Sequence, residues 1–404
     1  MHIPPGFAAV DGELGIAGKP ASHWVAEAGG TPLFVYNRAL IAARIEQLRS
    51  TLPAGVHIHY AIKANPMPAL VDWMARRVDG LDVASAGELR IALDSGMDPE
   101  HISFAGPGKR DAELELAIGA GVLLNLESEG ELERAARIAE QLGKPLRAAV
   151  RVNPPFDLKA SGMRMGGGAK PFGVDAERVP AMLARIAELG ALFEGFHVFA
   201  GSQNLSADSL IETQAKTIDL VAELAAHAPR PPRIANIGGG FGIPYFPGDK
   251  PLELDRVAEA LGEKLADRPP ILRETRFVIE LGRYLVGEAG VYLTRVVDRK
   301  ISHGETFLIV DGGMHHQLAA SGNFGTVIRR NYPVTNASRH GEAPSETANI
   351  VGCLCTPLDR LAEKALIPAA REGDLIAVFM AGAYGLSASP AAFLGHPAAG
   401  EILA

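Results

Sequence analysis

Cysteine is scarce in this sequence: among 404 residues, only Cys353 and Cys355 occur. Because two cysteines cannot supply a disulfide framework, a reducing cytoplasm is the compartment we expect. The two are separated by one residue on a predicted strand, which places both side chains on one face. No histidine or further cysteine close by in the sequence completes a ligand set, so we expect no zinc or other metal site.

Long apolar runs and basic stripes are missing as well. No segment approaches the roughly 20 apolar residues that span a membrane. The start of the chain lacks the basic and apolar regions of a signal peptide. The formal net charge is −8 and the isoelectric point is about 5.9, with no stripe of Lys and Arg. We therefore expect neither nucleic acid nor a membrane as a partner.

The composition is typical of a soluble globular protein, with 47% apolar and 21% charged residues. The length allows one large domain with a smaller one. Short apolar, β-branched runs alternate with amphipathic stretches such as 131–143 and 211–227. This alternation favours a parallel (β/α)8 barrel, with an open doubly wound sheet as the alternative. The eight predicted strands are 57–63, 81–85, 102–106, 122–128, 147–153, 193–200, 233–239 and 276–282.

Beyond about residue 290 the predicted strands follow one another without helices. The first 30 residues lack a strong helical pattern and contain a predicted hairpin over 10–18. We therefore expect residues 1–30 to join a C-terminal all-β domain, 286–404, and residues 31–285 to form the barrel. The Gly-rich stretch 159–173 is expected to be a loop near the barrel mouth. The predicted strands of the β domain are 291–301, 306–313, 348–355 and 374–382.

In such barrels the working residues sit at the C-terminal ends of the strands. The first strand ends at Lys63, where desolvation favours the neutral amine that forms a Schiff base. The triple glycine 238–240 follows the seventh strand and lets backbone N–H groups approach a phosphate. At the end of the eighth strand, Glu280 can hold a proton on a pyridine nitrogen, and Arg283 can bind a phosphate or a carboxylate. Each feature alone also fits a surface lysine, a turn or an ion pair, but together they favour a pyridoxal 5'-phosphate (PLP) site.

At these residues the sequence resembles the fold-type III PLP-dependent decarboxylases, the family of diaminopimelate, ornithine and arginine decarboxylases. The resemblance covers roughly residues 30–400 and is greatest to the subgroup associated with exosortase-type gene systems. Leu281 stands where the family has a proline. Seven motifs occur in the family's order: YAIKAN (60–65), DVASAGEL (82–89), NIGGGFG (236–242), ELGRY (280–284), DGG (311–313), GCLCTPLD (352–359) and GDLIAVFMAGAYG (373–385).

The resemblance implies a role for each matching residue. Lys63 holds PLP, Glu280 pairs with its pyridine nitrogen, and Cys355 returns a proton after CO2 loss. In this family the cysteine comes from the partner subunit, so a homodimer with shared sites is implied. Cys353 is expected to be a small buried hydrophobic residue. The residues expected to bind the cofactor are Lys63, Asp82, Phe199, Ser202, Gly239, Gly240, Glu280, Gly282, Arg283 and Tyr384, and those expected to contact substrate are Arg283, Thr356, Asp359 and Tyr384.

The implied reaction is decarboxylation of an amino acid, free or carrier-linked, through an external aldimine and a quinonoid. Alanine racemase shares the architecture but places an arginine against the pyridine nitrogen, so Glu280 favours decarboxylation. Three alternatives stay open: an amino acid racemase, a non-catalytic PLP-binding regulatory relative, and a sugar-phosphate barrel in which Lys63 binds phosphate.

The sequence departs from the family first at the stacking residue. Where these decarboxylases place a histidine over the pyridine ring, this chain has Phe199. A phenylalanine can stack but cannot carry a proton. His197 lies two positions earlier on the same strand face, so partial replacement by this histidine is an option.

The other departures concern the substrate's tail. The acidic residue that reads a distal amine is replaced by Thr356, although Asp359 remains. The Arg-Pro pair that binds a distal carboxylate is replaced by Ala319–Ala320, and Arg329 and Arg330 are out of register. Losing the partner of a buried ionic tail costs several kcal/mol. We therefore predict that diaminopimelate, ornithine and lysine are poor substrates, and that the tail is neutral or attached to a carrier.

Overall fold

The computed structural model describes residues 3–157, 163–323 and 330–404. The chain divides into two compact units. The barrel unit comprises Ile45–Ile243 and Pro251–Gly282, and the sheet unit comprises Met1–Arg44, Pro244–Lys250 and Arg283–Ala404. Whether separate domains fold with boundaries at residues 30 and 285 stays a prediction.

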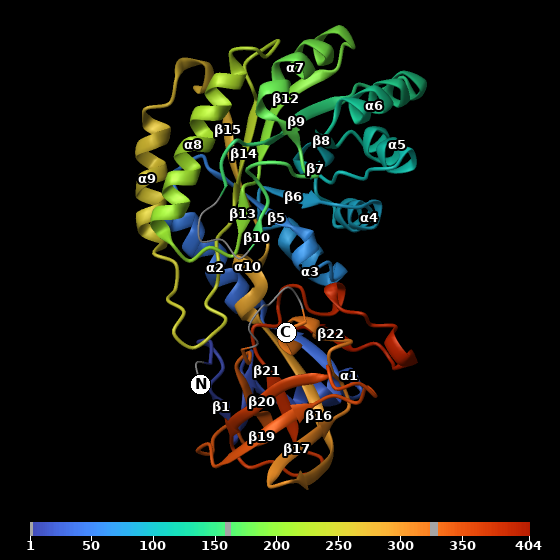
Figure 1. Ribbon diagram of the computed structural model, residues 1–404, viewed down its shortest axis with the longest axis vertical. Coiled ribbons are helices and arrows are strands. Elements are labelled where there is room, and N and C mark those ends of the chain that lie inside the picture. The colour runs from blue at the N-terminus through green and yellow to red at the C-terminus, as the bar shows by residue number, and fades with distance from the viewer. Residues whose placement is uncertain (1–2, 158–162, 324–329) are drawn as a thin grey trace. The chain divides into compact units, whose positions relative to one another are not determined.

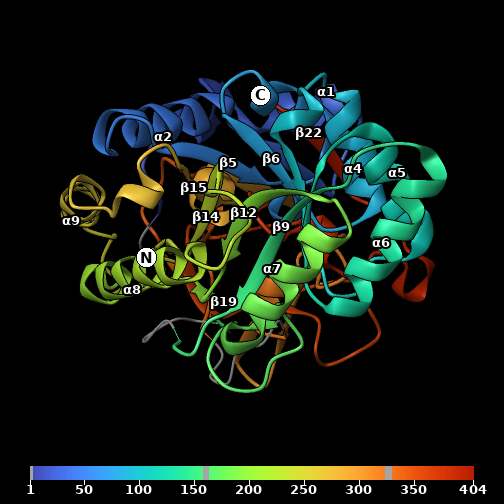
Figure 2. The ribbon, with the colours of Figure 1, turned by 90° about the horizontal axis from the view of Figure 1, so that it is seen from above.

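The barrel unit contains a closed ring of eight parallel strands, which confirms the predicted (β/α)8 barrel. The strand order is β9-β12-β14-β15-β5-β6-β7-β8, and β8 pairs with β9 to close the ring. Figure 2 shows helices lying around these strands. Because both faces of the strands are covered, most of their residues are buried, including polar ones such as Asp82 and Asn125. The strands are β5 (His57–Ala61), β6 (Gly80–Val83), β7 (Ile102–Phe104), β8 (Leu123–Leu126), β9 (Arg147–Asn153), β12 (Leu192–Val198), β14 (Ile234–Gly239) and β15 (Arg276–Leu281).

Serines cap the N-termini of barrel helices such as Ala86–Asp94 and Glu129–Leu142. Ser85 Oγ accepts a hydrogen bond from Glu88 N (3.2 Å), and Ser128 Oγ accepts one from Glu131 N (3.1 Å). Such N-caps end the strand before them, which is why the predicted strand 81–85 stops at Val83. The helices are α2 (Arg38–Thr51), α3 (Pro68–Ala75), α4 (Ala86–Asp94), α5 (Asp111–Ala120), α6 (Glu129–Leu142), α7 (Val179–Glu188), α8 (Ala207–Ala225) and α9 (Leu254–Ala266). Three two-residue strands accompany the barrel: β10 (Met163–Arg164), β11 (Val174–Asp175) and β13 (Gly201–Ser202).

The sheet unit is built on a mostly antiparallel sheet with the order β18-β21-β16-β17-β19-β20. Figure 1 shows chain from both termini in this unit, because β4 pairs with both β16 and β22. The strands are β4 (Leu33–Tyr36), β16 (Gly290–Ser302), β17 (Glu305–Val310), β18 (Val334–Asn336), β19 (Glu346–Val351), β20 (Arg360–Ile367), β21 (Leu375–Val378) and β22 (Gly400–Leu403).

The N-terminal segment differs in part from the expectation. The predicted hairpin is present as a meander of β1 (Ala9–Val10), β2 (Glu13–Ile16) and β3 (Lys19–Pro20). A helix that the sequence pattern did not indicate, α1 (Ala21–Ala28), follows the meander. This helix has two turns, which is too short for a clear periodicity, and it ends at Gly29 in the left-handed conformation. Residues 158–162 of the predicted Gly-rich loop lie outside the described residues.

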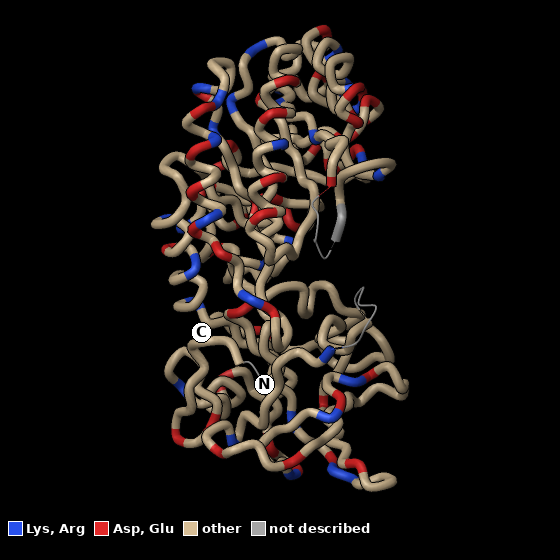
Figure 3. The backbone as a smooth tube through the Cα atoms, turned by 60° about the vertical axis from the view of Figure 1, so that its left-hand side comes forward, with Lys and Arg blue, Asp and Glu red and all other residues tan. Residues whose placement is uncertain are grey.

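Positions of Lys and Arg are interspersed with those of Asp and Glu along the backbone of the barrel unit (Figure 3). Many of these side chains form exposed ion pairs, such as Arg185 with Glu133 and Lys264 with Asp219. Within residues 3–157, 163–323 and 330–404, no helix combines the length and the apolar character needed to cross a bilayer.

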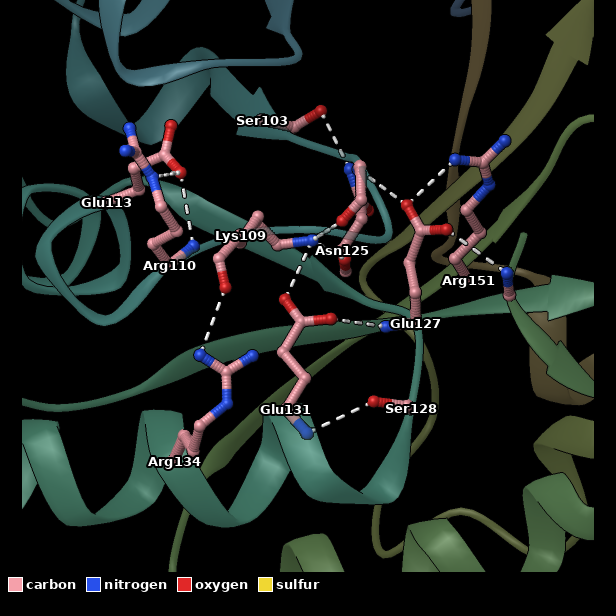
Figure 4. Close-up of polar contacts among 12 residues, drawn as sticks. Ser103, Lys109, Arg110, Glu113, Asn125, Glu127, Ser128, Glu131, Arg134 and Arg151 are labelled. Carbon is pink, nitrogen blue, oxygen red and sulfur yellow. Dashed lines mark hydrogen bonds and ion pairs between the residues drawn. The ribbon is translucent and has the colours of Figure 1, made fainter. Parts of the chain in front are cut away.

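One ion pair of the barrel unit is almost completely buried. Lys109 Nζ lies 2.7 Å from Glu131 Oε1, and their side chains are only 1% and 3% exposed. Lys109 also donates to the carbonyls of Gly106 (2.6 Å) and Asn125 (3.0 Å). Figure 4 shows the lysine directed at the carboxylate on α6. The pair therefore ties the segment after β7 to the first turn of α6.

Replacing Lys109 with methionine should reduce the free energy of unfolding by roughly 3–5 kcal/mol, because Glu131 would stay buried without its cation. Burial already raises the pKa of Glu131, against the opposing charge of Lys109. Urea unfolding at pH 7 measures the loss. A matched control is Lys216→Met, because Lys216 forms an exposed pair with Glu212 that contributes little. Equal stability of both variants would contradict this prediction.

Candidate active site

Lys63 and Glu280 meet at the C-terminal end of the barrel strands. The predicted strand 57–63 is shorter than expected, and Lys63 lies in a single 3₁₀ turn, Ile62–Ala64, directly after β5. Glu280 lies on β15, which pairs with β5. Lys63 Nζ donates a hydrogen bond to Glu280 Oε1 at 3.0 Å. The two residues predicted on the first and eighth strands are thus in direct contact.

In this pair the Glu280 carboxylate is buried, whereas the Lys63 side chain is exposed. The Glu280 side chain is 4% exposed, whereas that of Lys63 is 41% exposed. The expected desolvation of Lys63 is therefore not seen in this state, and its ammonium group is instead stabilised by an anion. His197 Nε2, on β12, lies 3.2 Å from the other carboxylate oxygen, Glu280 Oε2.

This arrangement keeps Glu280 ionised. Burial by itself would raise the pKa of the carboxyl group. The Lys63 ammonium and the contact with His197 outweigh this effect and hold the pKa of Glu280 well below its usual range. A buried carboxylate that stays charged can hold a proton on a ring nitrogen beside it, which is the task predicted for Glu280.

Phe199 lies just beyond the end of β12 and faces the lysine. Its ring is 9% exposed, and Lys63 Nζ lies 5.2 Å from the ring centroid. His197, the suggested partial replacement for a stacking histidine, lies against Glu280. The aromatic ring beside Lys63 is therefore that of Phe199.

The glycine run after β14 forms an open stretch of backbone. Gly238 and Gly240 adopt φ values of +70° and +74°, which side-chain-bearing residues rarely adopt. A Cβ atom on Gly239 would lie 2.2 Å from the carbonyl oxygen of Glu280, so only glycine fits there. Gly282 is similarly confined, because a Cβ atom there would lie 2.8 Å from Ala64 Cβ.

Ser202 adds a free hydroxyl to the barrel unit. Its Oγ atom is buried and has no hydrogen-bond partner among the described residues. A buried hydroxyl without a protein partner is free to bind a ligand that enters the site. An unpaired hydroxyl, a glycine backbone that can approach an anion, an ionised carboxylate and an accessible lysine fit PLP.

Asp82 belongs to a buried polar network inside the barrel. Its Oδ1 atom lies 3.1 Å from His59 Nδ1 and accepts a hydrogen bond from Ser103 Oγ. Its Oδ2 atom has no partner among the described residues. The predicted contact of Asp82 with the cofactor stays a prediction.

The sequence assigned no role to Glu88, yet its carboxyl group interacts electrostatically with Lys63. Glu88 Oε2 accepts a hydrogen bond from Ala84 N (2.8 Å). Burial raises the pKa of Glu88, and both this bond and the Lys63 charge oppose the rise. The motif DVASAGEL contains Glu88, so its position after the second strand was the available signal.

In the sheet unit, Arg283 is held by aromatic residues. Its Nη1 atom donates to Tyr245 Oη at 2.6 Å, and its guanidinium carbon lies 4.7 Å from the ring centroid of Tyr384. Tyr384 has a φ of +52°, a strained value for a tyrosine. No sequence signal pointed to Tyr245, because it lies in a loop with no strand end beside it.

Cys355 lies in a turn and not on the predicted strand 348–355, because β19 ends at Val351. Its thiol is exposed, and Thr356 beside it is half-buried. Cys353 is also partly exposed, with its Sγ atom 3.7 Å from His396 Nδ1. The expectation of a buried hydrophobic Cys353 was therefore wrong.

Asp359 is only 2% exposed and shapes the turn. Its two oxygens accept hydrogen bonds from the backbone N–H groups of Met314 (2.6 Å) and Leu354 (2.8 Å). Because the carboxylate is buried and each of its oxygens already accepts a backbone N–H, the geometry favours a structural role over the predicted substrate contact.

The alanines that replace the family's Arg-Pro pair lie in a 3₁₀ turn, Leu318–Ser321. Arg330 stacks on Phe246, with its guanidinium carbon 3.9 Å from the ring centroid, and forms an ion pair with Asp249 at 3.7 Å. Arg329 lies outside the described residues.

Comparison with known proteins agrees with this chemistry. The family model of the pyridoxal-dependent decarboxylases, pyridoxal binding domain, matches residues 38–287. The L-glutamyl-[BtrI acyl-carrier protein] decarboxylase of Niallia circulans is 39% identical over 92% of this chain and 88% of the relative. The diaminopimelate decarboxylase of Aquifex aeolicus is 34% identical over 97% of this chain and 91% of the relative.

Solved structures agree as well. Diaminopimelate decarboxylase from M. jannaschii in co-complex with L-lysine has a TM-score of 0.86 at 26% identity and covers 99% of this chain and 93% of that chain. The Helicobacter pylori diaminopimelate decarboxylase complexed with L-lysine has a TM-score of 0.82 at 27% identity, with coverages of 95% and 94%. With a family model that matches more than half of its length, this chain belongs to the pyridoxal-dependent decarboxylases and is a PLP-dependent amino acid decarboxylase.

Proposed function

We propose that this enzyme decarboxylates an amino acid whose tail is neutral because it is joined to a carrier. The proposal rests on the side chains at the positions where related decarboxylases bind the charged end of the substrate. Thr356 and Ala319–Ala320 have no charge, and the Asp359 carboxylate is occupied by two backbone N–H groups. A free ammonium or carboxylate tail would be desolvated there without a partner, at a cost of several kcal/mol. The carrier-protein substrate in the name of the Niallia circulans relative supports the proposal.

Bound PLP supplies the electron sink for breaking the bond to the carboxyl group. The residues of this chain then have separate tasks. Lys63 supplies the amine that holds the cofactor, and Glu280 keeps a proton on the pyridine nitrogen. Phe199, whose ring lies beside Lys63, would pack against the cofactor ring. Gly239 and Gly240, with the free hydroxyl of Ser202, offer hydrogen-bond donors to the phosphate.

The remaining residues act from the sheet unit. Arg283 and Tyr384 are proposed to bind the phosphate or the substrate carboxylate. Cys355 is proposed to return a proton to Cα, and its exposed thiol suits a residue that works in the site of a partner subunit. The homodimer, the cytoplasmic location and the similarity to the exosortase-associated subgroup stay predictions.

A substrate comparison tests the proposed tail. With purified holoenzyme, kcat/KM for CO2 release from a glutamyl thioester of an acyl-carrier protein should exceed that for free meso-diaminopimelate, L-ornithine and L-lysine by at least about 100-fold, the factor that corresponds to the lost charge partners. A diaminopimelate decarboxylase in the same assay verifies the free substrates. Efficient turnover of any of the three free amino acids would overturn the proposal.

A further inference from the structure

Three loops of the sheet unit meet beside the turn that carries Cys355 and Thr356. Cys353 Sγ lies 3.5 Å from the carbonyl oxygen of Asp311 and 3.7 Å from His396 Nδ1. The ring of His396 lies 5.4 Å from that of His315, between centroids. The loop after β17, the loop after β19 and the segment before β22 are thus in contact at this point.

Two side chains in this region are buried without partners. His315 and Gln317 are both 0% exposed. Neither ring nitrogen of His315 and neither amide atom of Gln317 has a hydrogen-bond partner among the described residues. Their neighbour His316 differs, because it contacts Tyr292 Oη (3.1 Å) and the carbonyl oxygen of Pro397 (2.8 Å). Buried polar atoms are rarely left unpaired, so these atoms are available to a ligand that reaches them. Their position beside the turn of Cys355 and Thr356 distinguishes them from unpaired atoms elsewhere in the described residues.

Gln317 also lies next to a residue with a predicted role. A Cβ atom on Gly385 would lie 2.9 Å from Gln317 Oε1, and Gly385 directly follows Tyr384. The unpaired atoms therefore adjoin both predicted substrate elements of this unit, Tyr384 and the turn of Cys355 and Thr356.

The unpaired groups are neutral. Burial, together with the neighbouring histidines, lowers the pKa of His315 to about 4, so its ring is uncharged at pH 7. The carboxylate of Asp311, which borders the region, accepts hydrogen bonds from Thr294 Oγ1 (2.6 Å) and Arg295 N (2.8 Å). Within the described residues, no group of three or more His, Cys, Asp or Glu side chains could hold a metal ion. Neutral donors and acceptors suit a polar, uncharged ligand.

We propose that His315 and Gln317 are specificity-determining residues that hydrogen-bond the amide or thioester groups of the substrate's neutral tail. This inference rests on the proposed function and names the residues that read the tail. Both side chains are covered in the sheet unit, and His396 packs against His315. The proposal therefore includes a displacement of the segment around His396 when the tail binds.

The test uses Gln317→Leu, which keeps the size of the side chain and removes its polarity. If the amide serves only the substrate, the free holoenzyme should keep or raise its Tm, because an unpaired polar group has been removed. KM for a glutamyl-pantetheine thioester should rise by roughly tenfold or more, with kcat changed by less than about twofold. His315→Phe is expected to behave in the same way.

Gln214→Leu is the matched control. Gln214, on α8 in the barrel unit, is also buried, and both of its amide atoms also lack partners among the described residues. Its replacement should leave KM unchanged.

A readout independent of catalysis is binding of pantetheine alone, which should raise the Tm of the wild type and of Gln214→Leu but not of Gln317→Leu. Free L-glutamine distinguishes a simple carboxamide tail from a carrier arm, because turnover of glutamine would assign these residues to a free amide.

Two failures can be told apart. A wild-type enzyme that releases no CO2 from the thioester overturns the proposed function and this inference with it. An active wild type whose KM is the same as that of Gln317→Leu overturns the inference alone. A fall of several degrees in the Tm of Gln317→Leu, with KM unchanged, would give the amide a structural role and also overturn it.

Discussion

Replacing Lys63 with alanine should lower kcat for CO2 release by at least about 10³-fold, because no other amine at this position can hold the cofactor covalently. The contact of Lys63 with the ionised Glu280 shows that the amine is held at the buried carboxylate. Steady-state CO2 release from the carrier-linked substrate measures the loss. Borohydride treatment of the wild-type holoenzyme, followed by peptide mass analysis, should place the reduced cofactor on Lys63.

The variant Lys63→Arg distinguishes the loss of the reactive amine from the loss of the positive charge beside Glu280. Arginine keeps a cation beside Glu280, so the variant should fold, but it should be as inactive as Lys63→Ala. Lys216→Ala, a change in an exposed ion pair on α8, should have the activity of the wild type. Turnover by Lys63→Ala within about tenfold of the wild type would remove Lys63 from the mechanism.

Replacing Glu280 with glutamine should lower kcat by roughly 10²–10³-fold, because a neutral amide stabilises a protonated pyridine nitrogen much less than a buried carboxylate does. The Kd for PLP should change by a smaller factor than kcat, because Lys63 and the glycine backbone remain to hold the cofactor. Stopped assays of CO2 release and absorbance titration with PLP measure the two effects separately. Equal kcat in the variant and the wild type would contradict the role of Glu280.

The same variant has an expected pH signature in stability. The pKa of Glu280 in the folded state lies below its ordinary value of 4.5. Its ionisation therefore contributes stability that is complete above about pH 4.5 and is lost as the pH falls further. The wild-type apoprotein should be more stable than Glu280→Gln at pH 7, and the difference should shrink below pH 4.5. Urea unfolding at pH 7 and at pH 4 measures it.

The barrel and its lysine could be predicted from the sequence because the relevant signals are local. Each barrel strand is a short apolar run beside an amphipathic stretch, and a (β/α)8 barrel gathers the strand ends at one mouth. Lys63 and Glu280 were expected at two such ends, and in the structure they share a hydrogen bond although 217 positions separate them.

The specific partner of the short strand β4 could not be predicted from the sequence. The short strand β4 pairs with β22, and the hydrogen bond from Tyr36 to Glu401 spans 365 positions. A four-residue apolar run carries no sign of such a partner. The contacts of Asp359 could not be predicted either. The motif GCLCTPLD contains this residue, but it does not show that two backbone N–H groups donate to its oxygens.

The neighbouring positions of Gly239 and Glu280 link two tasks in one ladder. These residues face each other in the register of β14 and β15, so the glycine stretch proposed to bind the phosphate and the carboxylate proposed to hold the pyridine proton lie one strand spacing, about 4.8 Å, apart. Paired strands cannot slide independently. A substitution that shifts either strand should therefore alter both proposed contacts with the cofactor, the one at its phosphate and the one at its pyridine nitrogen.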